Sequence, residues 1–296
     1  MEFKKYQHIE RYGTDEVEGI DIGQCYVFPK IDGTNGSIWY DQQLGVCAGS
    51  RNRQLTLDSD NHDFYREVCT DVRYIDFFKG YPTLRLYGEW LVPHTLKTYR
   101  DGAWRKFYVF DVYDSDGVPL HYDVYSPILV DCGIDFIPPL LIVKNPSYER
   151  LVHCMENVNT YLIDEGKGVG EGIVIKNYTY TNKYGRRTWA KMVRNEFKDQ
   201  HRINQPTEVG EKVSVEERIV GEFLSDAMID KAYAKIVAED GWSSKKIPQL
   251  FGRVYHDLVT EDVWNVCKKL KNPTINFKRL NQMVIYRIKQ YKQEIF

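Results

Sequence analysis

Lys30-Ile31-Asp32-Gly33-Thr34-Asn35 places a lysine directly before an acid, a tight turn and two small polar side chains. The preceding run, Cys25-Tyr26-Val27-Phe28, has the aromatic and β-branched residues typical of a strand. A strand that ends here would direct the lysine into a pocket, where a deprotonated amine can attack the α-phosphate of a nucleotide. Because Gly33 has no Cβ, we expect the backbone to turn sharply and to approach a bound phosphate closely.

Five further segments follow this string in order along the chain. They are Ser50-Arg51-Asn52-Arg53, Leu86-Tyr87-Gly88-Glu89-Trp90, Phe107-Tyr108-Val109-Phe110-Asp111, Glu171-Gly172-Ile173-Val174-Ile175-Lys176 and Trp189-Ala190-Lys191. With the Lys-x-Asp-Gly string they resemble motifs I, Ia, III, IIIa, IV and V of the covalent nucleotidyltransferases, which comprise ATP-dependent DNA and RNA ligases and mRNA capping enzymes. The resemblance covers roughly residues 20 to 200 and is strongest to the phage-type RNA ligases of the RNA ligase 2 group.

The resemblance implies a role for each matching residue. Lys30 would be the catalytic nucleophile that forms lysyl-AMP, and Asp32 and Glu171 would bind Mg²⁺ or Mn²⁺ through carboxylate oxygens. Glu89 would accept a hydrogen bond from the ribose, and the ring of Phe110 would stack on the adenine. The ATP-binding residues implied in this way are Lys30, Ile31, Asn35, Arg51, Glu89, Phe110, Glu171, Lys176 and Lys191.

The basic residues that would hold the α-phosphate leave alternatives open. Lys176 and Lys191 match the basic positions of motifs IV and V. Glu171 and Lys176 are five residues apart, so they would project to opposite faces of a strand unless it ends or bulges between them. Relatives carry Lys-x-Lys in motif V, whereas Val193 stands at the second position here. The candidates for the missing contact are Arg194 and Lys198.

Neighbouring side chains compete for two other roles. Either Arg51 or Arg53 would meet the nucleotide phosphate or the 5′-phosphate of the nucleic acid, since both share one face of an extended segment. In the aromatic run, alternation places Tyr108 and Phe110 on one face and Phe107 on the other. If Phe110 stacks on the base, Phe107 therefore belongs to the core.

The first two hundred residues predict an α+β domain of antiparallel sheets with flanking helices. Aromatic and β-branched runs with strand character occupy residues 26–28, 36–40, 84–87, 107–110 and 172–176. Helical spacing occurs over residues 60–78 and 147–165, with Ser147 as a cap for the second helix. By resemblance this is a nucleotidyltransferase domain, an ATP-grasp-like ligase fold.

Residues 205–296 predict a small all-helical domain. The segment 205–210 contains one Pro and one Gly and is a candidate linker, and Ser214 and Glu217 form a capping box before apolar residues at helical spacing. We therefore divide the chain into an adenylyltransferase domain, 1–204, and a helical domain, 205–296, with an expected RNA-binding role. DNA ligases and capping enzymes usually carry a β-barrel in this place, so the helical tail favours an RNA ligase.

Charge, cysteine content and hydrophobicity indicate which ligands and which cellular compartment to expect. The net charge is −2, with a balance of −5 over residues 205–240 and +7 over residues 241–296. The basic segment predicts either a phosphate-binding face or ordinary solvated helices. Six cysteines without a Cys-x-x-Cys pair favour neither disulfides nor zinc. With no apolar run long enough for a bilayer, we expect a cytoplasmic protein of a bacterium or of a viral host cell.

The sequence therefore predicts an ATP-dependent RNA ligase that requires ATP and Mg²⁺ or Mn²⁺. Its partners would be RNA ends with a 5′-phosphate and a 3′-OH, with no membrane and no obligate protein partner. The alternatives are an ATP-dependent DNA ligase, a capping guanylyltransferase, and a non-catalytic protein of the same fold that binds nucleic-acid ends.

Overall fold

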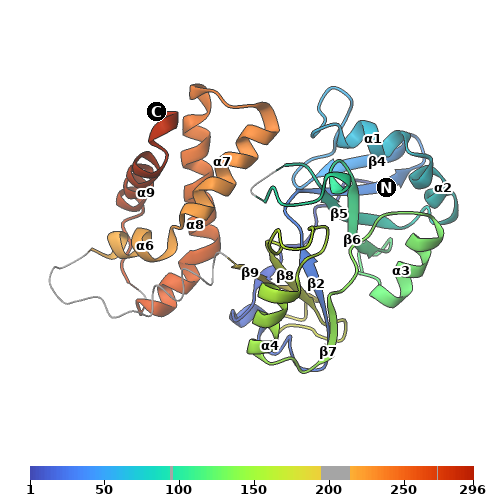
Figure 1. The fold of residues 1–296 in the computed structure, drawn as a ribbon, viewed down its shortest axis with the longest axis horizontal. Coiled ribbons are helices and arrows are strands. Elements are labelled where there is room, and N and C mark those ends of the chain that lie inside the picture. The colour runs from blue at the N-terminus through green and yellow to red at the C-terminus, as the bar shows by residue number, and fades with distance from the viewer. Residues whose placement is uncertain (94–95, 195–213, 272) are drawn as a thin grey trace. The chain divides into compact units, whose positions relative to one another are not determined.

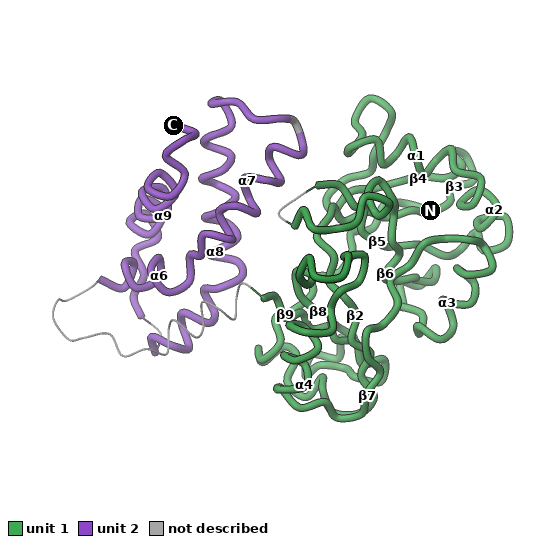
Figure 2. The backbone as a smooth tube through the Cα atoms, viewed as in Figure 1, with its two compact units in different colours: residues 1–194 green, residues 195–296 purple. Residues whose placement is uncertain are grey.

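The computed structural model describes residues 1–93, 96–194, 214–271 and 273–296. The chain forms two compact units, residues 1–194 and 195–296 (Figure 2). The predicted α+β class is confirmed, because two sheets occupy the first unit and helices occupy the described part of the second (Figure 1). The predicted boundary at 204/205, the linker 205–210 and Lys198 lie outside the described residues.

A five-stranded sheet carries the lysine of the opening string. Its strand order is β1 (Glu10–Arg11), β9 (Ala190–Val193), β8 (Gly172–Lys176), β2 (Gln24–Lys30) and β7 (Leu141–Lys144). Neighbouring strands are antiparallel except β1 and β9, which are parallel. The predicted strand before Lys30 is confirmed, and it is an interior strand of the sheet with a partner on each side.

A four-stranded antiparallel sheet carries the acid and aromatic motifs. Its order is β4 (Gly45–Ser50), β3 (Thr34–Asp41), β5 (Arg85–Trp90) and β6 (Phe107–Tyr113). Residues 31–33 link β2 directly to β3, so the opening string passes from one sheet to the other. Buried residues of β2, β5, β6 and β8 form an inter-sheet core that includes Phe28, Tyr87, Tyr108 and Val174.

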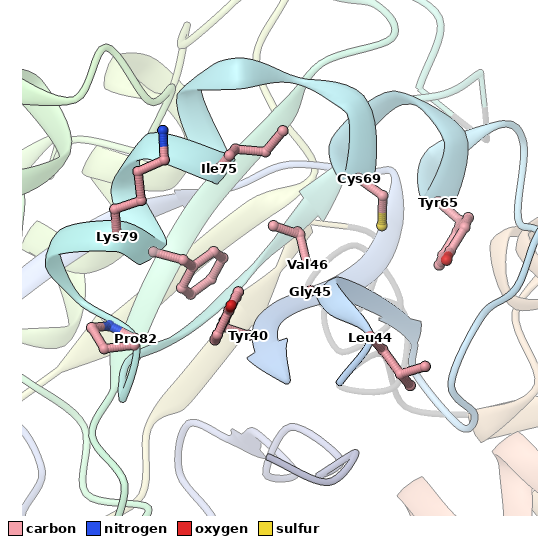
Figure 3. A pocket seen from close by; sticks show the side chains of 10 residues that line it. Tyr40, Leu44, Gly45, Val46, Tyr65, Cys69, Ile75, Lys79 and Pro82 are labelled. Atoms are coloured by element: carbon pink, nitrogen blue, oxygen red, sulfur yellow. The ribbon is translucent and has the colours of Figure 1, made fainter. Parts of the chain in front are cut away.

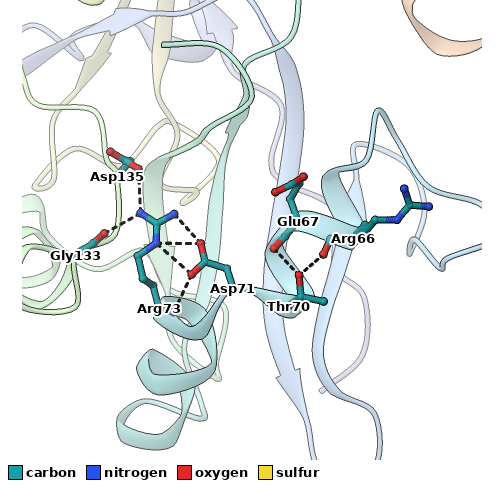
Figure 4. Close-up of polar contacts among 7 residues, drawn as sticks. All are labelled: Arg66, Glu67, Thr70, Asp71, Arg73, Gly133 and Asp135. Atoms are coloured by element: carbon teal, nitrogen blue, oxygen red, sulfur yellow. Dashed lines mark hydrogen bonds and ion pairs between the residues drawn. The ribbon is translucent and has the colours of Figure 1, made fainter. Parts of the chain in front are cut away.

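Helices α1 (Phe64–Thr70), α2 (Val72–Gly80) and α3 (Tyr122–Asp131) cover the outer face of the four-stranded sheet (Figure 1). The single helix predicted over 60–78 is divided at Asp71, whose extended backbone ends α1 and whose side chain caps α2 at the Arg73 amide. The Arg73 guanidinium also donates to both oxygens of Asp71, to the Gly133 carbonyl and to Asp135 (Figure 4). This arginine therefore fixes the start of α2 against the segment after α3.

The helix predicted from residue 147 is shorter than its spacing suggested. Helix α4 (Tyr148–His153) begins at Ser147, whose hydroxyl accepts from the Arg150 amide, as expected of a cap. It continues as one π-helical turn, Cys154–Val158. Shorter 3₁₀ turns lie at Asp15–Val17, Asp101–Ala103, Ser244–Lys246 and Gln293–Ile295.

The described part of the second unit consists of helices α6 (Val215–Phe223), α7 (Asp226–Asp240), α8 (Ile247–Lys269) and α9 (Phe277–Tyr291) around one apolar core. The predicted capping box of Ser214 and Glu217 is present at the start of α6. Across the described residues, no helix combines the length and the apolar character needed to cross a membrane.

The two oppositely charged halves of this unit pair with each other. Among the described residues, acids of 214–240 form ion pairs with at least five of the eleven basic residues of 241–296. The basic partners are Arg253, Lys269, Arg279, Arg287 and Lys292. Part of the +7 balance is thus neutralised within the unit, and a phosphate-binding face remains a prediction.

A β-bulge in β6 sets the direction of two side chains. Tyr87 pairs with Asp111 and Gly88 pairs with Val109, so Phe110 is an extra residue without a partner on β5. Phe107 and Val109 lie in the helix-covered core, whereas Phe110 contacts the inter-sheet core, as alternation predicted for the run. After the bulge, Asp111 bonds with inter-sheet residues as well.

Replacing Gly88 with alanine tests how tightly the bulge is packed. A Cβ here would lie 2.5 Å from the Tyr108 carbonyl oxygen and 2.6 Å from the Phe107 ring. We expect Gly88→Ala to lower the free energy of unfolding by about 1–3 kcal/mol in a urea titration. Gly80→Ala, where the added Cβ meets nothing within 4 Å, should change it by less than about 0.5 kcal/mol. Equal effects of the two changes would contradict this account.

Candidate active site

Lys30 and Glu171 meet where β2 and β8 adjoin. The register pairs Lys30, the last residue of β2, with Gly172, the first residue of β8. Glu171 lies one residue before that strand, and its Oε2 is 2.5 Å from Lys30 Nζ. The two side chains are 23% and 11% exposed, so the pair is largely desolvated and still open to a ligand.

The strand register also shows how Glu171 and Lys176 are placed relative to the two faces of the sheet. Because β8 begins at Gly172, Glu171 is outside the strand and does not follow its alternation. Directly opposed residues of antiparallel strands share a face, and the pairs Lys30 with Gly172 and Val174 with Lys191 are in register. Lys30, Lys176 and Lys191 therefore belong to the same face of the five-stranded sheet.

The turn after Lys30 is held by strand β5. The Gly33 amide donates to Glu89 Oε1 at 3.1 Å. A Cβ on Gly33 would lie 2.5 Å from the Trp90 carbonyl oxygen and 2.9 Å from Glu89 Cγ. We expected this glycine to admit a phosphate, and the structure adds a different requirement, the close approach of β5. Asn35 of β3 lies directly opposite Glu89 of β5, so both side chains share one face of the four-stranded sheet.

Asp32, a predicted metal ligand, is buried and bonded to a distant segment. Its Oδ2 accepts from the Leu96 amide at 2.8 Å, and its own amide donates to the Tyr99 hydroxyl at 2.8 Å. Ile31 beside it is buried in the inter-sheet core. Within the described ranges, no three His, Cys, Asp or Glu side chains are grouped to hold a metal ion. Mg²⁺ that is held by one or two carboxylates, substrate phosphates and water needs no such group, so Asp32 and Glu171 fit that mode.

Tyr99 is a site residue that our sequence reasoning missed. Burial raises the pKa of its hydroxyl above the ordinary value; the hydrogen bond from the Asp32 amide acts in the opposite direction, and the charges of Asp32, Glu171 and Glu89 raise the pKa. The hydroxyl therefore keeps its proton at neutral pH. No local spacing signals this contact, because 67 residues separate Tyr99 from Asp32.

Lys176 lies beneath Phe110 in a buried polar network. Its Nζ donates to the Phe110 carbonyl at 2.6 Å and to Asp111 Oδ1 at 2.8 Å, and the lysine is 2% exposed. Asp111 also accepts from the Tyr6 hydroxyl and from Trp189 Nε1. Burial lowers the pKa of Lys176, while Asp111 acts in the opposite direction. The predicted phosphate ligand thus holds the bulge carbonyl beside the predicted adenine-stacking ring.

Val193, which stands at the second basic position of motif V, lies within the sheet. It pairs with Gly172 and is buried. Arg194 lies beside Glu171, because its amide donates to the Glu171 carbonyl at 3.0 Å and its Nη1 donates to the Val169 carbonyl at 3.3 Å. Of the two candidates for the missing motif V contact, Arg194 thus lies near the Lys30–Glu171 pair. Lys198 lies outside the described residues.

Arg51 and Arg53 differ in their hydrogen bonds. The Arg53 guanidinium donates to the carbonyls of Ser59 and Asp60 in its own loop. Both arginines are exposed, and the described residues give the Arg51 side chain no hydrogen bond or ion pair. Arg53 therefore shapes the loop, which favours Arg51 as the phosphate contact.

A pocket on the other side of the four-stranded sheet is separate from this site. It lies between the β3–β4 turn and helices α1 and α2 (Figure 3), with walls that include Tyr40, Val46, Cys69 and Ile75. None of the predicted site residues lines it. Burial raises the pKa of the Cys69 thiol to about 12, so it is no nucleophile at neutral pH. We therefore assign the chemistry to the inter-sheet side.

A model of the RNA ligase family matches residues 23–193, which is more than half of the 296 residues. The chain thus belongs to the RNA ligase family. The matched range contains every residue of the predicted site. None of the curated proteins compared with the chain matches it.

Among solved structures, the chain is similar to forms of an RNA ligase from Naegleria gruberi. One is a mutant with ATP and Mn, with 19% identity, a TM-score of 0.49, and coverage of 68% of this chain and 58% of that one. Another is a mutant with AMP and Mn, with 18% identity, a TM-score of 0.49, and coverage of 67% and 58%. A third, with PPi, has 19% identity, a TM-score of 0.48, and coverage of 68% and 59%. The match spans less than two thirds of that ligase's length.

Removing the buried ammonium tests the network below Phe110. Lys176→Met would leave the Asp111 carboxylate buried without its cation, and we expect a loss of about 3–5 kcal/mol in the free energy of unfolding. Lys79→Met removes an exposed lysine paired with Asp76 and should cost less than about 1 kcal/mol. Adding Asp111→Asn to Lys176→Met should restore part of the loss; further destabilisation instead would contradict the proposed pairing.

Proposed function

We propose that the protein is an ATP-dependent RNA ligase, which joins a 5′-phosphate RNA end to a 3′-OH RNA end through lysyl-AMP and AppRNA. The observation that carries the proposal is the 2.5 Å contact of Lys30 Nζ with Glu171 at the adjoining ends of β2 and β8. The contact joins a lysine and a carboxylate inside the range that matches the RNA ligase family, which supports Lys30 as the nucleophile. The helical domain, residues 205–296, would contribute to RNA binding.

In the first step, Lys30 Nζ forms a bond to the α-phosphorus of ATP. The bond from that phosphorus to the bridging oxygen breaks, and pyrophosphate leaves with the electron pair. The ammonium must first transfer a proton to water, because only the neutral amine attacks. Glu171 holds the amine in place, and a divalent metal bound by Asp32, Glu171 and the phosphates would offset the negative charge of the phosphates.

The surrounding side chains would orient the nucleotide. Phe110 would stack on the adenine, supported from below by the bond of Lys176 to the Phe110 carbonyl. Glu89, fixed by the Gly33 amide, would accept a hydrogen bond from the ribose. The phosphate contacts would come from Lys191 and Arg51, with Arg194 in place of the second motif V lysine. The contribution of these residues is positioning and charge stabilisation.

Two further transfers complete the reaction. A 5′-phosphate oxygen of RNA attacks the phosphorus of lysyl-AMP, which breaks the P–N bond, returns the amine of Lys30 and gives AppRNA. The 3′-OH of the second end then attacks the 5′-phosphorus. A phosphodiester forms, and AMP leaves.

Labelling with α-³²P-ATP and Mg²⁺, followed by a denaturing gel, tests the first step. We expect a labelled protein band that pyrophosphate removes. Lys30→Ala should abolish it, whereas Lys144→Ala, an exposed lysine on the neighbouring strand β7, should retain it. The labelled protein should then transfer AMP to a 5′-phosphorylated RNA.

Absence of label in a folded wild type, after pyrophosphate treatment to remove any bound AMP, would overturn the ligase proposal. Label that persists in Lys30→Ala would overturn the choice of nucleophile. Sealing of DNA 3′-OH ends but not RNA 3′-OH ends would replace RNA ligase with DNA ligase.

A further inference from the structure

Residues 96–106, which precede β6, are hydrogen-bonded to the turn that follows Lys30. Two hydrogen bonds make the connection, and both use Asp32. The Asp32 carboxylate accepts from the Leu96 amide at 2.8 Å, and the Asp32 amide donates to the Tyr99 hydroxyl at 2.8 Å. The two bonds run in opposite directions, so each segment is donor and acceptor to the other.

Tyr99 is itself rigidly held. Its side chain is 4% exposed, and its ring packs edge-on against Trp104 with the centroids 5.4 Å apart. Its backbone forms a bridge with Ile163, and the next amide, of Arg100, donates to the Leu162 carbonyl at 2.9 Å. The backbone and ring of Tyr99 are therefore fixed, and so is the position of the hydroxyl that contacts Asp32.

We propose that Tyr99 is a positioning residue for the lysine nucleophile, acting through the amide of Asp32. This inference rests on the proposed function. Asp32 is two residues after Lys30, so the Tyr99 hydroxyl fixes the backbone from which the amine attacks and holds Asp32 where its second carboxylate oxygen can serve the metal. Small displacements of a reacting group lower rates strongly.

Tyr99→Phe removes the hydroxyl alone. We expect the single-turnover rate of lysyl-AMP formation to fall about ten-fold or more, with the KM for ATP within about two-fold of the wild type. Sealing of a pre-adenylylated RNA, which requires no attack by Lys30 on ATP, should change less than about two-fold. Tyr108→Phe is the matched control, because Tyr108 is equally buried in the same core and donates to the Ala103 carbonyl. It should leave both rates unchanged.

Amide hydrogen exchange gives a readout that does not depend on activity. Exchange in peptides covering residues 31–34 should become faster in Tyr99→Phe and stay unchanged in Tyr108→Phe. Wild-type labelling in Tyr99→Phe, or an equal loss in both reaction steps, would overturn the positioning role. A wild type that forms no lysyl-AMP would refute the proposed function itself, and unchanged exchange would separately refute the contact between Tyr99 and Asp32.

Discussion

The register between β2 and β8 is the constraint on which the site depends. It sets Lys30 opposite Gly172, so that the end of one strand meets the start of the other and Glu171 lies against the lysine amine. A shift of one residue would turn the side chains of β2 to the opposite face. Gly172 protects this register, because a Cβ there would lie 2.1 Å from the Met192 carbonyl oxygen of β9. Three strands are therefore fixed together at the proposed site.

Burial of charge is the second organising feature. Asp111 is fully buried, and three donors, Lys176, Tyr6 and Trp189, satisfy its oxygens. A buried ion pair of this kind contributes little net stability, but breaking it is costly. Its position explains why the bulge at Phe110 persists: Lys176 and Tyr125 both donate to the Phe110 carbonyl. The network thus fixes a backbone irregularity and holds the Phe110 ring next to Lys176.

Features that a local pattern determines could be predicted from the sequence. Alternation identified the face of Phe110, and the caps at Ser147 and Ser214 begin helices as predicted. Features that depend on residues far apart in the chain could not be predicted. Arg73, whose amide is capped by Asp71 at the break, donates to Gly133 and Asp135, and the contact of Tyr99 with Asp32 has no local signal. The sequence shows the net charge of each half of the helical unit. The ion pairs between the halves depend on how α7, α8 and α9 pack, which the sequence does not show.

In the proposed reaction one lysine, at the end of β2, carries the nucleotide. Peptide mass mapping of the protein after incubation with ATP and Mg²⁺ would locate the adduct without substitutions. We expect AMP on Lys30, with Lys176 and Lys191 unmodified. AMP on either of those lysines, or a protein that binds ATP without forming any adduct, would contradict this expectation.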